Sequence, residues 1–191
     1  IDTSVSLGEP GFEERQTLEN GVKAAAAGGF THIMLNPNNQ PNPQDQSGIK
    51  YLKNVTANQA VNILPVGSFS LNQKGEHIAE LYDMQQAGAV SFYDYKKEIN
   101  NANLLKVGLQ YTSSFNGVVQ SYPQNKEIAG KGMVNEGPNS TRLGLKGIPA
   151  LAEELHVARD LFLLEYAEGK LHSPTISTAK SVQLVRESKQ K

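Results

Sequence analysis

Ile1-Asp2-Thr3-Ser4-Val5-Ser6-Leu7-Gly8-Glu9-Pro10-Gly11 is the stretch that decides the fold. Asp2, Ser4 and Ser6 alternate with apolar or neutral residues, and this period of two predicts a β-strand that carries all three on one face. Glu9-Pro10-Gly11 then predicts the turn that ends the strand. The first predicted strand therefore presents polar side chains where it ends.

The composition excludes several classes of function. The 191 residues suffice for one hydrophobic core, and 18 Lys and Arg against 19 Asp and Glu give no excess charge to attract nucleic acid or an anionic membrane. No apolar run approaches the roughly 20 residues that span a bilayer, and no signal peptide is visible. The chain contains no cysteine, so it has no disulfide framework and no thiolate site. We expect a cytoplasmic protein without a nucleic acid or membrane partner.

Strands and helices are predicted to alternate about six times. Beyond the first strand, apolar runs predict strands at 31–35, 61–67, 89–94, 117–121 and 170–175. Helices are predicted at 14–27, 49–55, 76–87, 102–115 and 149–168, and a last helix holding Val182 and Val185 with Ser177 as its N-cap. The strands are apolar throughout, which is typical of parallel strands covered by helices.

The helix predicted at 149–168 has the strongest pattern. Its apolar residues recur at steps of four, three and four, as in an amphipathic helix with one face toward the core. They are Leu151, Leu155, Ala158 and Phe162. In the helix at 76–87, His77 is expected near the start and Ile78, Leu81 and Tyr82 on the inward face. The segment 130–147 is predicted to be a long Gly-rich connection.

A TIM barrel and a doubly wound open sheet both fit this alternation. No Gly-X-Gly-X-X-Gly follows the first strand, so a dinucleotide-binding sheet has little support. In a TIM barrel the reactive groups lie at the C-terminal ends of the strands. The polar residues at these ends are Ser4, Ser6, Asn38, Asp94, Ser121 and Thr175. Six units cannot close eight strands, so we expect residues 1–191 to form part of a (β/α)8 barrel, with the other strands and any flanking small domain outside this chain.

The opening stretch resembles the first-strand motif of the dihydroorotases, Asp-X-His-X-His-Leu-Arg-Glu-Pro-Gly. Asp2, Leu7, Glu9, Pro10 and Gly11 match this motif. Further matches occur in the same order along the chain. They are Gly21 to Gly29, Met34 to Pro41 (family Met-Pro-Asn-Thr-X-Pro), Ala87 to Val90, Asn135-Glu136-Gly137, Arg142 to Leu145, Leu171-His172 and Ser177 to Ala179. The resemblance implies a TIM barrel of the metal-dependent hydrolase type.

The resemblance also implies which residues should carry the chemistry. Dihydroorotases bind one or two zinc ions with histidines from strands one, five and six and a carboxylate or carboxylated lysine from strand four. Here the four histidine positions hold Ser4, Ser6, Ser121 (or Tyr122 in another register) and Thr175, and Asp94 falls on strand four. Gly8 replaces the substrate-binding arginine, while Asn38 matches the asparagine that contacts substrate. We therefore predict no metal and no cofactor.

Several residues keep two interpretations open. Asp94 is either a turn cap or a remnant ligand, and Asn38 serves either the turn or a ligand. A serine nucleophile would need a base within reach, and the sequence places no histidine for it. The histidines do not form a metal-binding pair. They are His32, His77, His156 and His172.

Two functions of different classes remain. The first is a dihydroorotase-like protein of pyrimidine biosynthesis that has lost catalysis and acts as a non-catalytic subunit, holding aspartate carbamoyltransferase as some inactive relatives do or associating with itself. The second is a divergent cyclic amidohydrolase that opens dihydroorotate to N-carbamoyl-aspartate with an altered metal site. A small-molecule sensor that uses the vacant pocket is a third.

Overall fold

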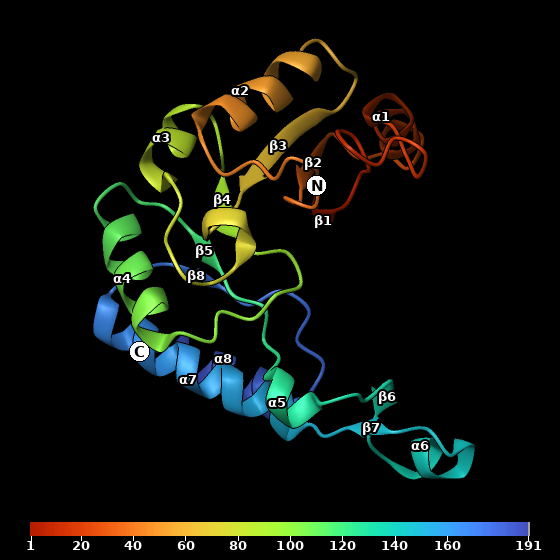
Figure 1. Ribbon diagram of the computed structural model, residues 1–191, viewed down its shortest axis with the longest axis vertical. Helices are drawn as coiled ribbons and strands as arrows, with labels where there is room; N and C mark the ends of the chain where they lie inside the picture. The colour runs from red at the N-terminus through yellow and green to blue at the C-terminus, as the bar shows by residue number, and fades with distance from the viewer. Residues whose placement is uncertain (191) are drawn as a thin grey trace.

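The computed structural model describes residues 1–190. Within this range a curved sheet of six parallel strands has the order β1-β2-β3-β4-β5-β8. Helices α1, α2, α3, α4 and α7 lie on the outer side of the curve (Figure 1). The arrangement is a half-barrel, which confirms the predicted parallel strands in sequential order.

The element bounds locate the strand ends on which the site depends. The strands are β1 (Asp2–Val5), β2 (His32–Leu35), β3 (Asn62–Gly67), β4 (Ser91–Tyr93), β5 (Val119–Gln120), β6 (Val134–Asn135), β7 (Gly147–Ile148) and β8 (Leu171–His172). The α-helices are α1 (Leu18–Ala27), α2 (Gln46–Val55), α3 (Leu81–Gln86), α4 (Ala102–Ser113), α5 (Lys126–Ala129), α6 (Pro138–Leu143), α7 (Leu151–Ala167) and α8 (Ala179–Ser188), and the 3₁₀ helix η1 is Leu71–Gln73.

Two apolar clusters join the sheet to its helices. Around β1, β2 and β3, Ile33 and Leu35 are buried with Leu52 of α2. Around β4 and β5, Phe92 is buried with Leu105 and other residues of α4. Burial of this kind stabilises each layer by roughly 1.5–3 kcal/mol per large side chain. No helix among residues 1–190 combines the length and the hydrophobicity needed to cross a membrane.

Local side-chain caps explain where several helices begin. Thr17 accepts a hydrogen bond from the backbone of Asn20, so α1 starts at Leu18 rather than at residue 14. Thr178 caps α8 through the Ser181 backbone, so the prediction of Ser177 as N-cap was wrong by one residue. His77 does not open a helix, because α3 starts at Leu81 and the His77 carbonyl accepts from Leu71.

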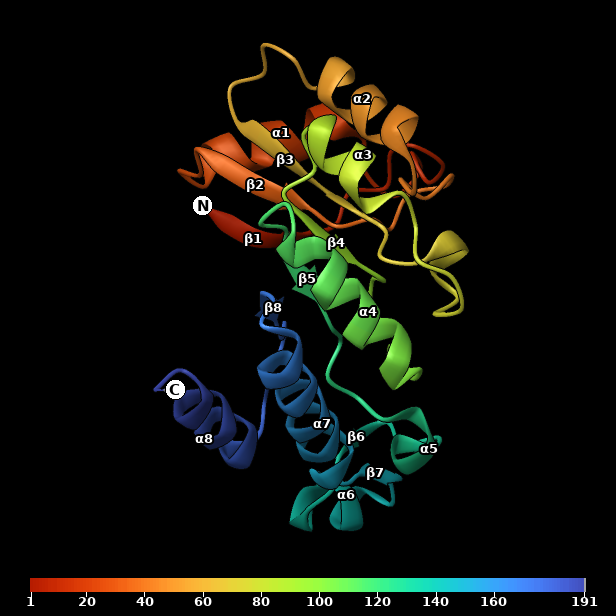
Figure 2. The same ribbon diagram turned by 90° about the vertical axis from the view of Figure 1, so that its left-hand side faces the viewer.

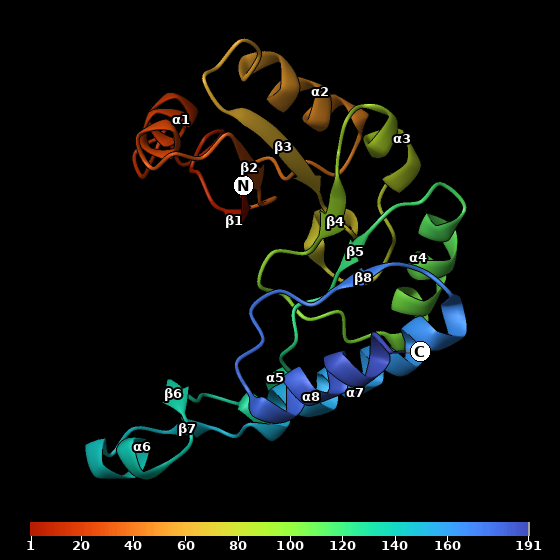
Figure 3. The same ribbon diagram turned by 180° about the vertical axis from the view of Figure 1, so that it is seen from behind.

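The connection predicted to be Gly-rich and irregular contains short strands and a short helix that the sequence pattern does not predict. Strands β6 and β7 pair in parallel, with α6 between them. This segment extends away from the half-barrel (Figure 3).

Helix α7 is rotated about its own axis relative to the prediction, so a different face is buried. Its buried face contains Ala152, His156, Val157 and Asp160. The expected inward residues Leu151, Leu155 and Phe162 are instead exposed, as is Tyr82 on α3. The physical reason is that polar side chains of α7 have partners inside the protein. Helices α7 and α8 lie side by side at the end of the molecule remote from α1 and α2 (Figure 2).

Candidate functional site

The ends of the parallel strands gather the predicted site residues at one edge of the sheet. Ser6 follows β1, Asp94 directly follows β4, and Ser121 directly follows β5. Thr175 lies three residues beyond β8. In parallel sheets built this way the C-terminal strand ends are the position of the active groups. The contacts of these side chains therefore decide what the edge can do.

The two serines of the first strand are held by an asparagine that the sequence analysis did not single out. The amide nitrogen of Asn36 donates to Ser4 Oγ and to Ser6 Oγ, each over 3.2 Å. Asn36 directly follows β2 and is 1% exposed. Both amide hydrogens are used, which ties the end of β1 to the end of β2. The sequence signal that could have identified Asn36 is its position, since it is a polar residue directly after an apolar strand.

Gly8 is enclosed by the loop that comes after it. Its N–H donates to the Gln16 carbonyl over 3.0 Å, and its own carbonyl accepts from Phe12 N–H over 2.8 Å. A β-carbon at position 8 would overlap the Phe12 carbonyl oxygen and lie 3.0 Å from the Gln16 oxygen. Position 8, where the family motif has its substrate-binding arginine, therefore cannot accept a side chain unless this loop moves.

Asp94 caps a neighbouring turn. Its Oδ1 accepts from the backbone N–H groups of Phe69 (3.0 Å) and Ser70 (2.9 Å), and its Oδ2 accepts a short hydrogen bond from the Ser70 hydroxyl. Burial raises the pKa of the Asp94 carboxyl, and the hydrogen bonds from Ser70 and Phe69 act in the opposite direction. Of the two open interpretations the contacts support the cap, and the turn it caps follows β3 rather than β4.

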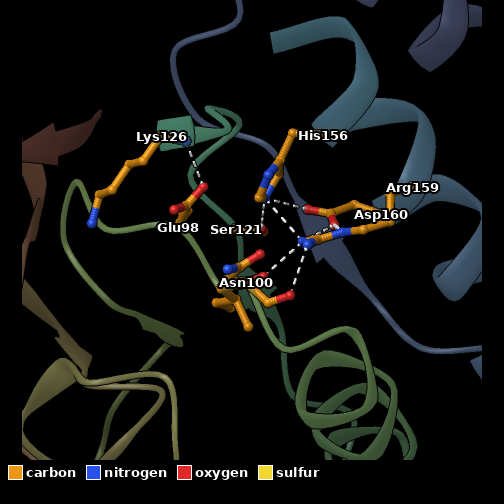
Figure 4. A network of polar contacts seen from close by, with 8 residues as sticks. Glu98, Asn100, Ser121, Lys126, His156, Arg159 and Asp160 are labelled. Atoms are coloured by element: carbon orange, nitrogen blue, oxygen red, sulfur yellow. Dashed lines mark hydrogen bonds and ion pairs between the residues drawn. The ribbon is translucent and has the colours of Figure 1, made fainter. Parts of the chain in front are cut away.

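Ser121 lies in a buried polar network with α7 (Figure 4). The Ser121 Oγ is 3.5 Å from His156 Nε2, and the same nitrogen is 3.5 Å from Asp160 Oδ2 and 3.0 Å from Arg159 Nη2. The expectation that no histidine stands near Ser121 was therefore wrong. Arg159 also donates to the Ile99 carbonyl over 2.8 Å.

This network does not have the geometry of a catalytic triad. In a triad, one imidazole nitrogen faces the serine and the other faces the carboxylate, whereas His156 uses Nε2 for both. An arginine can only donate hydrogen bonds. Its contact with His156 therefore requires Nε2 to be the unprotonated, accepting nitrogen of a neutral imidazole. Burial lowers the pKa of His156, Asp160 opposes this and Arg159 adds to it. With Ser121 fully buried, the network joins β5 to α7.

The remaining predicted residues lie in loops with structural contacts. The Asn38 side-chain nitrogen donates to the Leu7 carbonyl over 2.9 Å, and its buried oxygen has no hydrogen-bond partner among the described residues. Thr175 borders a cavity of about 340 Å³ that Tyr122 and Glu153 also line. The Glu153 carboxylate accepts hydrogen bonds from the backbone and hydroxyl groups of Ser177 and Thr178, which fixes the loop beside this cavity.

The side chains at the strand ends do not fit the zinc of dihydroorotases. Zinc in proteins is held by imidazole, thiolate and carboxylate. Here the histidine positions offer only neutral hydroxyls, and both oxygens of Asp94 already accept hydrogen bonds. In residues 1–190 no three His, Cys, Asp or Glu side chains gather as a metal site.

Gly8→Ala should destabilise the protein by about 1–3 kcal/mol, because the added methyl group overlaps the Phe12 carbonyl. Chemical denaturation measures this free energy of unfolding. Gly137→Ala is the control, since a β-carbon there meets no atom within 4 Å. Equal stability of both variants would show that the loop after Gly8 opens freely.

Asp94→Asn should change how stability depends on pH. Because burial raises the pKa of Asp94, its contribution to stability is fully present below the unfolded pKa, near 4, and declines as pH rises through the folded pKa. The unfolding free energy of the native protein should therefore fall relative to that of the variant as the pH rises above about 4. Denaturation at several pH values measures it, and a pH-independent difference would contradict the assignment.

Comparison with known proteins places these features in a family. The sequence model of the family described as "Dihydro-orotase-like" matches residues 1–181. The chain is 44% identical over 189 residues to "Dihydroorotase" of Pelotomaculum thermopropionicum, covering 99% of this chain and 44% of that protein. It is 40% identical over 192 residues to "Dihydroorotase" of Acetivibrio thermocellus, covering 100% and 45%. The chain thus spans under half the length of these relatives.

Solved structures agree on the fold. "Structure of D-hydantoinase" superposes with a TM-score of 0.72 at 16% identity, covering 100% of this chain and 43% of that one. The dihydroorotase of Saccharomyces cerevisiae in complex with 5-fluoroorotic acid superposes with a TM-score of 0.69 at 14% identity, covering 100% and 51%. The half-barrel thus has the fold of part of these proteins, and the chain belongs to the dihydroorotase-like family.

Proposed function

We propose that this chain is a non-catalytic, dihydroorotase-like subunit of pyrimidine biosynthesis. One observation carries the proposal: the polar side chains on or directly after β1, β4 and β5 that match the family's metal positions form hydrogen bonds within the protein. Asn36 binds both serines of the first strand, Ser70 binds Asp94, and Ser121 faces the His156 network. Groups used in this way are not a preorganised set of metal ligands.

The residues that match the family motif serve the frame of the fold. Glu9 Oε2 accepts from the Leu18 N–H over 2.8 Å and so caps the start of α1. Gly144 ends α6 in the left-handed conformation with φ of 65°. Glu136 of the matched Asn135-Glu136-Gly137 packs so closely against Gly147 that a β-carbon on Gly147 would collide with it. Because most substitutions destabilise by about 1 kcal/mol, retention of such residues supports a role that needs the fold.

The competing function is a divergent dihydroorotase. Its support is the 44% identity to a protein named "Dihydroorotase". This function requires metal ligands from outside the strand ends, together with a substitute for the substrate-binding arginine at Gly8. An arginine–carboxylate contact is worth roughly 1.5–3 kcal/mol, so its absence weakens substrate binding as well as chemistry.

Ser4→His with Ser6→His should not restore ring opening of dihydroorotate. The double variant supplies two imidazoles but leaves Ser121, Thr175 and Gly8 unchanged. The measurements are zinc content after purification without chelator and turnover with added zinc. We expect well under one zinc per chain and no turnover in either protein. Close to one tightly bound zinc in the unaltered chain, with turnover lost in Asp94→Ala, would establish the divergent enzyme instead.

Aspartate carbamoyltransferase is the partner we propose for this subunit. Light scattering of the chain mixed with the transferase of the same cell should show a species heavier than either protein. The transferase mixed with an unrelated protein of equal mass is the control. Two independent species at micromolar concentration, with transferase activity unchanged, would remove this partner.

A further inference from the structure

A small cavity lies between the loop that follows β2 and the first turns of α2. Its volume is about 200 Å³, and its lining includes Pro10, Asn39, Pro41, Pro43 and Tyr51. We call it the proline cavity. It shares no residue with the cavity beside Thr175 and none with the positions that match the family's metal ligands. The proline cavity is therefore a separate feature of the molecule.

Hydrogen bonds fix the walls of the proline cavity. The Gln40 N–H donates to the Pro10 carbonyl over 2.9 Å, which joins the loop after β1 to the loop after β2. The Ser68 N–H donates to the Pro43 carbonyl over 2.7 Å. Asp45 Oδ1 accepts from the Gly48 N–H over 2.9 Å and so caps the start of α2. A site that is formed in advance loses little conformational entropy when a ligand enters.

Asn39 gives the lining of the proline cavity an unused hydrogen-bond acceptor. The residue is 1% exposed, and its Oδ1 has no hydrogen-bond partner among the described residues. Its side-chain nitrogen donates to the Glu9 carbonyl, which fixes the orientation of the amide because only the nitrogen can donate. A buried acceptor without a partner is costly and requires an explanation. An N–H donor that enters the cavity would satisfy it.

The chemistry of the lining selects an aromatic ring with an N–H group. Proline rings and the tyrosine ring are surfaces on which aromatic rings pack. The residues that line the proline cavity carry no charge, so an ionic ligand has no partner there. A volume of about 200 Å³ is below the roughly 300–1,000 Å³ of sites for drug-sized molecules, so the cavity holds one ring system. Indole combines the ring system with a single N–H donor.

The position of the proline cavity suits an indole that belongs to a protein. Tyr51 lines the cavity and is 45% exposed, so the cavity lies at the surface. Tryptophan is enriched among the side chains that fill pockets at the centre of protein interfaces. The 191 residues contain no tryptophan, so a second copy of them does not supply the indole.

We infer that the proline cavity receives a tryptophan side chain of a different protein, with the indole N–H donating to Asn39 Oδ1. The inference goes beyond the proposed function. It does not depend on the loss of catalysis or on which protein carries the tryptophan.

Binding of N-acetyltryptophanamide tests the inference, because this probe carries the side chain together with its peptide groups. The chain has no tryptophan, so all indole fluorescence comes from the probe. We expect a saturable fluorescence change with a dissociation constant of about 1 mM or lower. Tyr51→Ala should raise this constant at least about fivefold. Tyr82→Ala is the matched control, since Tyr82 is also 45% exposed but lies on α3.

Two outcomes of this titration would overturn the inference. One is the absence of saturation up to about 10 mM probe, which excludes a site of the expected affinity. The other is an equal loss of binding in Tyr51→Ala and Tyr82→Ala, which would place the probe elsewhere.

A matched probe tests the hydrogen bond to Asn39. In the N-acetylated amide of benzothienylalanine, sulfur replaces the indole N–H while the shape of the ring system is kept. In competition with N-acetyltryptophanamide it should bind at least about fivefold more weakly, because Asn39 Oδ1 then stays unpaired. Equal affinity of the two amides would refute the assigned acceptor.

Free indole distinguishes a protein side chain from a small molecule. Both free indole and N-acetyltryptophanamide should bind, because the cavity opens to the surface beside Tyr51. Binding of free indole without binding of N-acetyltryptophanamide would show that the cavity excludes the peptide groups, and would overturn the assignment of a protein partner.

Discussion

A parallel strand must be followed by a crossover that returns the chain to the same end of the sheet, and the rest of this structure depends on that constraint. It places a helix on the outer side after most strands and brings every C-terminal strand end to one edge. Residues distant in sequence, such as Ser4 and Asn36, become neighbours there. The residues that come directly after each strand then decide the chemistry of the edge.

At this edge several buried polar side chains have hydrogen-bond partners within the chain, although the buried oxygens Asn38 Oδ1 and Asn39 Oδ1 have none among the described residues. Buried polar groups are costly unless they are hydrogen-bonded, and the contacts of Asn36, Asp94 and Ser121 meet that requirement with neighbouring strands, a turn and a helix. The result is a barrel edge that is cross-linked by hydrogen bonds. These hydrogen bonds are the basis of the non-catalytic role that we propose.

The sequence predicts the order and approximate position of the strands, because apolar runs and Gly or Pro breaks are local properties. It also predicts which polar residues follow the strands. It does not predict the Ser121–His156 contact, because that contact joins residues 35 positions apart and depends on how α7 is rotated. The same rotation explains why the inward face of α7 was predicted wrongly. The side chains of His156 and Asp160 are buried, so Leu151, Leu155 and Phe162 face outward.

The enclosed Gly8 has a consequence for the order in which substitutions can be tolerated. Any codon change that adds a side chain at position 8 meets the Phe12 carbonyl while the loop keeps its present path. The loop would have to take another path before position 8 could hold a side chain. The residue at position 8 and the path of the loop are thus coupled, and an arginine at this position would need a rearranged loop as well as a new side chain.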